Sequence, residues 1–214
     1  TQTHKDMRFQ NSYVIPYEHQ TVLDWYCRSG AFIRLAPSYD RIIPQQLAPG
    51  VSDGFIGSFL LGIGPFKIEW KSLHHQEANR NFIDEMIKGP FAKWVHHHQF
   101  IAEGTSTRLI DDIEWEGPFI SLLSPIFKNF VTESLRRNFA FRFRRLQHDL
   151  KRHEKYKNLP RLKIGITGAS GIIGTALSAF LSTGGHEVYH FVRRHTKHPR
   201  EIYWNPTTQE INTE

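Results

Sequence analysis

The sequence predicts two parts of different fold class, an α+β domain in which an antiparallel sheet wraps around a long helix, followed by the start of an α/β unit with parallel strands. Three observations predict this arrangement. Short β-type runs separated by Gly and Pro turns fill residues 41–115. A helical stripe of apolar residues follows over 124–154. A glycine-rich turn between two short apolar runs comes after that.

The length of 214 residues suits two small domains, or one domain with a fragment of a second. We expect residues 1–154 to form the first domain, 155–161 a linker, and 162–214 the beginning of a second domain. The linker is predicted from its polar residues and Pro160, which lie between two strongly patterned segments.

Composition excludes several classes of protein. Hydrophobic residues make up 39% and aromatic residues 13% of the chain, which is enough for a packed core and argues against disorder. The single cysteine, Cys27, excludes an internal disulfide. No stretch reaches the roughly 20 apolar residues that span a bilayer, and the first residues do not resemble a secretory signal. We therefore expect a cytoplasmic protein.

The first domain is predicted to begin with a strand over 7–15, a helix over 17–28 and a short helix or turn over 32–39. Six β-type runs follow, and turn signals such as Gly89-Pro90 separate them. Together they predict an antiparallel meander over residues 41–47, 54–61, 66–75, 81–87, 94–102 and 107–115.

A long helix is predicted over 124–154. Ser124-Pro125 is typical of an N-cap followed by proline at the first helical position. Apolar residues then recur every three or four positions, and this spacing places them on one stripe that can pack on the sheet. The stripe consists of Phe127, Val131, Leu135, Phe139, Phe143, Leu146 and Leu150.

Most of the positive charge lies in one segment. The whole chain carries a formal charge of +6, and residues 136–163 hold eleven Lys and Arg against only Asp149 and Glu154, a local net charge of +9. Such a run could bind nucleic acid or an anionic membrane, which steep salt dependence would reveal. Because it carries no nucleic-acid-binding motif, we interpret it as the solvated face of the long helix and expect no specific nucleic-acid partner.

Three segments of the first domain resemble a known superfamily. They are RSGAFIRLAP at 28–37, GPFAKWVHHHQF at 89–100 and GTSTRLIDDIEW at 104–115. They resemble the cyclase/dehydrase-like branch of the START-like helix-grip superfamily, also called SRPBCC, over roughly residues 7–152. The resemblance implies an α+β helix-grip fold with an apolar cavity between sheet and helix that binds a small hydrophobic molecule.

The second part carries the motif most closely tied to chemistry. A β-type run over 162–166 leads into a glycine-rich turn, a helix and a second strand over 187–192. Gly168 is expected to permit the tight turn, Gly171 to let a pyrophosphate approach the backbone, and Gly174 to let the helix pack closely. The pattern predicts an incomplete α/β Rossmann βαβ unit that binds NAD(P). Its predicted cofactor-binding turn is Thr167, Gly168, Ala169, Ser170, Gly171, Ile172, Ile173 and Gly174.

Two arginines predict which dinucleotide binds. Arg193 and Arg194 end the second strand, where an NAD-specific enzyme carries Asp or Glu. Two cations at this place favour the 2′-phosphate of NADP, so NADP is the expected cofactor and NAD the less favoured one. The alternative is that both arginines are ordinary solvent-exposed residues.

The glycine spacing also resembles a family of enzymes. Gly-x-x-Gly-x-x-Gly after Thr167 is similar to the extended and atypical short-chain dehydrogenase/reductases. Together with the first domain and YWNPTTQEI at 203–211, it resembles the NAD-dependent epimerase/dehydratase proteins. The resemblance implies that this chain joins a ligand-binding domain to the first part of an NADP-dependent oxidoreductase or epimerase.

The catalytic residues of such an enzyme are unknown from this sequence. None of the seven tyrosines is followed four residues later by lysine, so the Tyr-x-x-x-Lys pair of short-chain dehydrogenases is absent. We expect a truncated chain that is inactive alone, with the catalytic part missing from it. The alternative is a non-enzymatic carrier or sensor of a lipid- or polyketide-like ligand. Under either interpretation the protein could form a homodimer.

Histidines and carboxylates on the predicted strands are candidates for further sites. Alternation places His96 and His98 on one face of a strand. Because no third ligand has a suitable spacing, although His74 and His75 lie on another strand, we predict no metal site and expect a histidine hydrogen bond inside the domain. The strand carboxylates could include an acid–base pair or could simply alternate in solvent: Glu69, Asp84, Glu85, Asp111, Asp112, Glu114 and Glu116.

Overall fold

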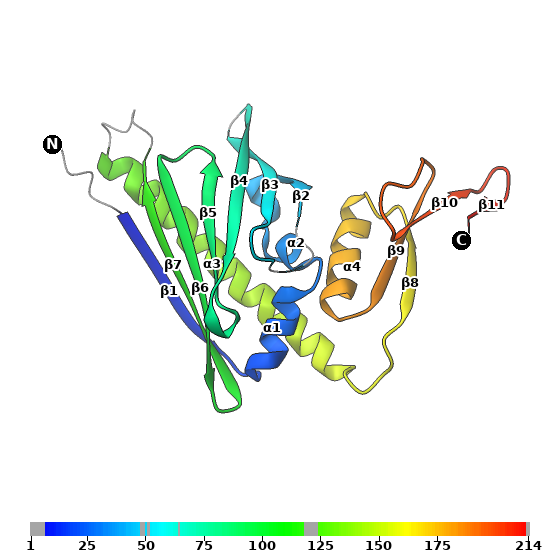
Figure 1. Ribbon diagram of the computed structural model, residues 1–214, viewed down its shortest axis with the longest axis horizontal. Helices are drawn as coiled ribbons and strands as arrows, with labels where there is room; N and C mark the ends of the chain where they lie inside the picture. Colours follow the sequence, from blue (N-terminus) through cyan, green and yellow to red (C-terminus); the bar gives the residue numbers. More distant parts are fainter. Residues whose placement is uncertain (1–6, 48–49, 51, 64, 118–123, 213–214) are drawn as a thin grey trace.

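The computed structural model describes residues 7–47, 50, 52–63, 65–117 and 124–212. Figure 1 shows a large sheet with a long helix at one end of the molecule and a smaller sheet with a short helix at the other, with two small helices between them. None of the described helices combines the length and apolarity that a membrane crossing needs.

Seven antiparallel strands form the large sheet, in the order β1-β7-β6-β5-β4-β3-β2. Strands β2 to β7 pair in sequence order, so the predicted meander is confirmed, and β1 lies beside the last strand, with Met7 opposite Trp115. The strands are β1 Met7–Ile15, β2 Ile42–Gln46, β3 Ile56–Ile63, β4 Phe66–Gln76, β5 Phe82–Lys88, β6 Lys93–Glu103 and β7 Ser106–Glu116.

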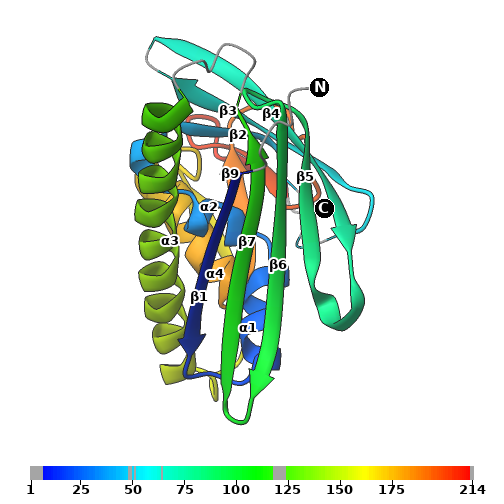
Figure 2. The same cartoon turned by 90° about the vertical axis from the view of Figure 1, so that its left-hand side faces the viewer.

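The long helix α3 (Ser124–Lys155) runs along this sheet, as Figure 2 shows. Its apolar stripe is buried as predicted, with Val131, Leu135 and Phe139 in one hydrophobic cluster and Leu146 and Leu150 in another. Basic residues lie on its outer side, where Arg136, Arg137, Arg144 and Arg152 are exposed. The interpretation of the basic run as a solvated helix face is therefore confirmed for these residues.

Short helices connect β1 to the rest of the sheet. They are α1 (His19–Cys27), α2 (Ala31–Leu35) and the 3₁₀ turn η1 (Ser38–Asp40), and a second 3₁₀ turn, η2 (Ala78–Arg80), joins β4 to β5. α1 is shorter than the predicted helix, and it buries Val22, Leu23, Trp25 and Tyr26 against the sheet and α3.

A second sheet follows α3 in the order β11-β10-β9-β8. β8 (Lys163–Thr167), β9 (Glu187–Val192) and β10 (Glu201–Asn205) are parallel, and β11 (Glu210–Ile211) pairs antiparallel with β10. Helix α4 (Ile172–Thr183) joins β8 to β9 and covers a core of Ile166, Ala169 and Val188. The sequence predicted β8, α4 and β9 but not β10 and β11, because no glycine-rich turn follows β10 as one follows β8, and β11 has only two residues.

The helix α4 also packs against the first part of the chain. Arg28 Nη1 donates to the Thr183 carbonyl at 2.9 Å, and the His153 ring stacks on Phe180 with 4.7 Å between ring centroids. The buried positions of α4 are Ser178, Ala179 and Thr183. This helix therefore contacts both the second sheet and the helices of the first part.

Candidate functional site

The predicted phosphate-binding turn lies between β8 and α4. Gly168 has a φ of +66°, a left-handed conformation that favours glycine. The Gly171 N–H donates to the Gly168 carbonyl at 2.9 Å and closes the turn. The tight turn expected at Gly168 is therefore present.

Gly174 lies where α4 crosses this turn. A Cβ atom at this position would come within 2.2 Å of the Gly168 carbonyl oxygen and 2.7 Å of Ala169 Cα. Both are backbone atoms that cannot move aside, so only glycine allows the helix to approach so closely. The Thr175 hydroxyl adds a hydrogen bond of 3.0 Å to the Ala169 carbonyl, which further fixes the turn.

The N-terminus of α4 faces solvent. Its N-cap, Gly171, offers no side-chain hydrogen bond, and its first turn carries no acidic residue. Ile172 and Ile173 are 93% and 82% exposed. Uncapped N–H groups and the positive end of the helix dipole make such a terminus suitable for binding a phosphate.

The two arginines at the end of β9 differ in their surroundings. Arg194 holds Glu201 through two hydrogen bonds of 2.8 and 2.5 Å, and this contact lowers the pKa of Glu201 to about 2. Arg193 is exposed and forms no ion pair with any residue in the part of the chain that the structure describes. Of these two arginines, Arg193 is therefore the one that can bind an added anion without first breaking a contact.

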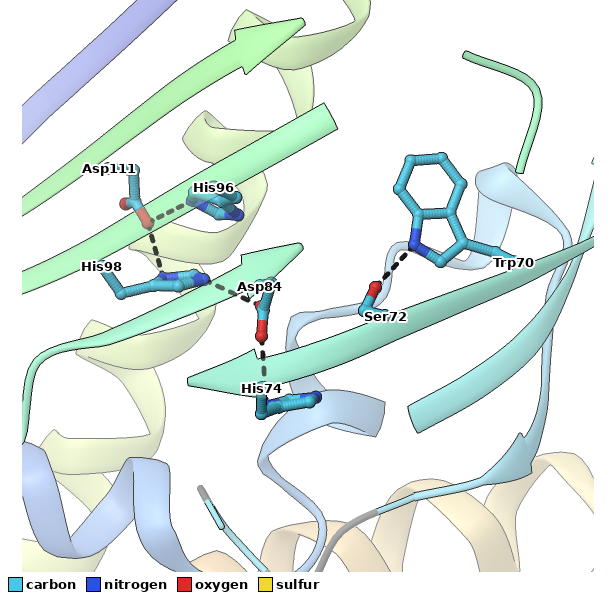
Figure 3. Close-up of polar contacts among 7 residues, drawn as sticks. All are labelled: Trp70, Ser72, His74, Asp84, His96, His98 and Asp111. Atoms are coloured by element: carbon cyan, nitrogen blue, oxygen red, sulfur yellow. Dashed lines mark hydrogen bonds and ion pairs between the residues drawn. The ribbon is translucent and has the colours of Figure 1, made fainter. Parts of the chain in front are cut away.

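A second group of polar side chains lies on the inner face of the large sheet (Figure 3). Asp111 Oδ1 on β7 is 3.0 Å from His96 Nε2 and 3.0 Å from His98 Nδ1. The second ring nitrogen of His98, Nε2, is 3.1 Å from Asp84 Oδ2 on β5. On β4, His74 Nδ1 lies 3.1 Å from Asp84 Oδ1. Four neighbouring strands thus contribute to one network, which we call the histidine–aspartate cluster.

The protonation of this cluster follows from its contacts. His98 faces a carboxylate with each ring nitrogen, and only an imidazolium can donate from both. Burial lowers the pKa of His98, but hydrogen bonds to Asp111 and Asp84 outweigh burial and raise it. Burial, reinforced by the charge of His98, lowers the pKa of His96 to about 4. These contacts therefore favour a proton on His98 over one on His96.

Both aspartates remain ionised for the same reason. Burial alone would raise their pKa values, but hydrogen bonds from the histidines lower the pKa of Asp84 and lower that of Asp111 further. The cluster lies between the two hydrophobic clusters of the first part, since Phe139 packs against His96 and Phe82 stacks on His98. It is a charged group inside an otherwise apolar interior.

Comparison with known proteins finds similarity of two kinds. The chain is similar in structure to the nucleoside-diphosphate sugar epimerase of Corynebacterium glutamicum, with 29% sequence identity and a TM-score of 0.76. The match covers 92% of this chain and 41% of that one, so the chain spans less than half of the epimerase.

Epimerase-family proteins also match in sequence alone. An epimerase family protein of Mycobacterium leprae is 41% identical over 51 residues, which is 24% of this chain and 17% of that protein. One of Mycobacterium bovis is 41% identical over 49 residues, 23% of this chain and 16% of its own length. No protein-family model matches the chain.

Other solved structures are similar in fold alone. The Zhui aromatase/cyclase of Streptomyces sp. R1128 has a TM-score of 0.57 at 11% identity, covering 72% of this chain and 98% of its own. Norcoclaurine synthase of Thalictrum flavum has a TM-score of 0.52 at 16% identity, covering 69% and 88%. The predicted antiparallel sheet wrapped on a long helix, a helix-grip fold, is confirmed.

Two hollows open at the surface of the part of the chain that the structure describes. One of about 390 Å³ lies on the outer face of the second sheet and is lined by Lys163, Gly165, Tyr189, Phe191 and Ile202. One of about 660 Å³ lies on the outer side of α3 beside His148, Lys151, Arg152 and Lys155. The space expected to hold a hydrophobic ligand contains the two hydrophobic clusters and the histidine–aspartate cluster.

The sequence predicted part of this geometry. The shared face of His96 and His98 and a histidine hydrogen bond inside the domain are confirmed. Among the strand carboxylates, Asp84 and Asp111 join the cluster, whereas Asp112 pairs with Arg8. These partners could not be predicted because strand register decides them. The one signal in the sequence was that each aspartate lies on a strand next to that of the histidines.

Proposed function

We propose that the turn at 167–174 binds the pyrophosphate of a nicotinamide dinucleotide, and that residues 162–214 are the opening Rossmann unit of an epimerase-type oxidoreductase. The observation that carries the proposal is the turn itself. A left-handed Gly168 and a close contact at Gly174 bring the open N-terminus of α4 next to the end of a parallel strand. This is the arrangement in which helix N–H groups bind a pyrophosphate.

NADP is the proposed cofactor because of Arg193. It lies just beyond β9, next to the end of β8 in the parallel sheet, and its guanidinium is available for the 2′-phosphate. Arg194 contributes only if it releases Glu201. We therefore assign the preference for NADP over NAD mainly to Arg193.

The helix-grip part is proposed to bind a small hydrophobic molecule in the whole protein. Norcoclaurine synthase, which shares this fold, has been solved in complex with dopamine and hydroxybenzaldehyde. Such a ligand would lie between the large sheet and α3, beside the two hydrophobic clusters. The catalytic residues of the oxidoreductase are proposed to lie outside this chain.

Titration of the purified chain with NADP and with NAD tests the cofactor proposal, with binding followed by calorimetry. Gly171→Leu should abolish binding, because the φ of Gly171, −78°, accepts a side chain that would then occupy the path of the pyrophosphate. Arg193→Ala should weaken NADP binding by roughly 10- to 100-fold and leave NAD binding unchanged, as expected for loss of a charged hydrogen bond.

Arg200→Ala is the matched control, because Arg200 is another exposed arginine of the same segment. It should leave both affinities unchanged. Equal affinity of Gly171→Leu and the unmodified chain for NADP would refute the pyrophosphate site. Binding of an apolar fluorescent probe without any dinucleotide binding would instead favour a carrier or sensor.

A further inference from the structure

The histidine–aspartate cluster has the donor set of a transition-metal site. His96, His98 and Asp84 each offer one ligand atom, and these atoms lie within 4.8 Å of one another. Ligand atoms around a tetrahedral zinc ion lie roughly 3.3 Å apart, so small side-chain rotations bring the three atoms into place. Strand register joins them, since Asp84 pairs directly with His96 across β5 and β6.

We propose that His96, His98 and Asp84 bind a divalent transition-metal ion, and that zinc is the ion they fit best. Two imidazoles and one carboxylate are ligands that zinc prefers, and three protein ligands leave a fourth position open. The third ligand, which the sequence spacing did not reveal, comes from the adjacent strand.

Charge in the interior also favours a cation. Asp84 and Asp111 place two carboxylates in a setting that is otherwise apolar, next to Phe82 and Phe139. A divalent ion neutralises both carboxylates while both histidines are neutral. Buried charges that lack a compensating partner are costly, so this balance stabilises the occupied site.

One carboxylate oxygen in the cluster has an ion-pair partner but no hydrogen bond. Asp84 Oδ1 and His74 Nδ1 are both shielded from solvent and lie 3.1 Å apart, but neither makes a hydrogen bond. The two atoms are close enough for an ion pair but form no hydrogen bond, and a metal ion held by Asp84 would satisfy the carboxylate more fully. This observation is independent of the spacing of the three ligands.

Asp111 has the position of an outer carboxylate that orients metal ligands. Its Oδ1 accepts from His96 Nε2 and His98 Nδ1, which leaves His98 Nε2 facing Asp84. Carboxylates that hold the second nitrogen of a ligating histidine are common around zinc. Asp111 is therefore a positioning residue in this proposal.

An ion can reach the cluster from one side. His96 and His98 are buried, but the side chains of Asp84 and His74 are 25% and 19% exposed. The cluster therefore approaches the surface at the β4–β5 end, where a hydrated ion can exchange its waters for the protein ligands.

Calorimetric titration of the full chain with zinc chloride tests the proposal, using protein purified without a histidine tag and freed of metal with a chelator. We expect one zinc ion per chain. His96→Gln and Asp84→Asn should weaken binding more than tenfold, and Asp111→Asn by about 10- to 100-fold, as for other outer-shell carboxylates. Zinc should also raise the melting temperature of the unmodified chain but not that of His96→Gln.

His97→Gln is the matched control, because His97 lies on the same strand but outside the buried cluster. It should bind zinc as the unmodified chain does. The proposal is overturned if the unmodified chain binds no zinc, or if a His96→Gln/His98→Gln double variant binds it equally well. If the variants do not fold, the visible spectrum of Co²⁺ added to the unmodified chain decides: a tetrahedral spectrum supports the site and an octahedral one overturns it.

Discussion

The Arg34 guanidinium and the Asp149 carboxylate form two hydrogen bonds of 2.7 and 2.6 Å in the interior. Asp149 is 2% exposed, so its charge has almost no contact with water. Removing one partner of such a pair leaves an uncompensated buried charge, which is far more costly than breaking a pair in solvent. This contact joins α2 to α3 and differs in kind from the ion pairs along the outer face of α3.

Arg34→Met should therefore lower the free energy of unfolding by about 3–5 kcal/mol, as measured by urea denaturation. The control is Arg136→Met, which removes an exposed ion pair with Glu133 on the outer face of α3. That change should cost less than about 0.5 kcal/mol. Similar losses in the two variants would show that burial does not control the energy of the Arg34 pair.

At the scale of elements, α4 is held in place by its neighbours α1, α2 and α3. Gly30 has a φ of +100°, and a Cβ there would lie 2.6 Å from the Ala179 carbonyl of α4. Arg28 donates to the carbonyl of Thr183 at the C-terminus of α4, where a cation also interacts favourably with the helix dipole. The helix that begins at the proposed phosphate site is thus anchored at its other end.

Gly30→Ala tests this anchoring against a second glycine with similar backbone strain. Gly104 also has a positive φ, +61°, but an added Cβ there would meet nothing within 4 Å. Both variants should lose about 1 kcal/mol from backbone strain, and Gly30→Ala should lose a further 1–3 kcal/mol from collision with α4. Thermal unfolding measures the difference, and equal melting temperatures would contradict the close α2–α4 contact.

The docking of α4 should also depend on pH through His153. Burial, followed by the charges of Arg28 and Arg161, lowers the pKa of His153 to about 4, against an opposing effect of Asp149. The unfolded chain, in which the pKa is near 6.5, therefore binds the proton first as the pH falls. Stability from this residue is complete above about pH 6.5 and decreases toward pH 4.

Comparing His153→Gln with the unmodified chain isolates this effect. Between pH 7 and pH 5 the unmodified chain should lose about 1 kcal/mol more stability than the variant, after discounting for the part of the ring that solvent reaches. Urea denaturation at both pH values measures the change. Parallel pH profiles for the two proteins would show that His153 does not couple protonation to the docking of α4.

At the scale of the whole molecule, α4 belongs to two packed regions. It covers the core of the second sheet with Leu181, and it places Ala179 and Thr183 against the first part of the chain. Because one helix serves both regions, loss of either core removes support from the other. The two parts should therefore depend on each other for stability.

Calorimetric unfolding of the full chain should show a single transition, with equal calorimetric and van't Hoff enthalpies. Hydrogen exchange provides a second measurement, because Gly30→Ala should then speed exchange in β8 and β9 as well as in α1 and α2. Two resolved transitions, with β8 and β9 unaffected by that substitution, would mean that the parts fold independently.

The sequence by itself determined the local features of this protein. Short β-type runs between Gly and Pro turns predicted the meander, the apolar stripe from Phe127 to Leu150 predicted α3, and the glycine spacing predicted the turn at Gly168. These features follow from nearest neighbours along the chain, because side-chain period and glycine conformation are local properties. The helix-grip arrangement followed from the order of these elements.

Only the tertiary structure decided which distant residues meet. Asp84 lies beside His98 because of the register between β5 and β6, and a shift of one residue would turn it to the other face of the sheet. Glu201 engages Arg194 because β10 runs parallel to β9, which the sequence did not reveal. Register and packing depend on contacts between residues far apart in the chain, so no local pattern contains them.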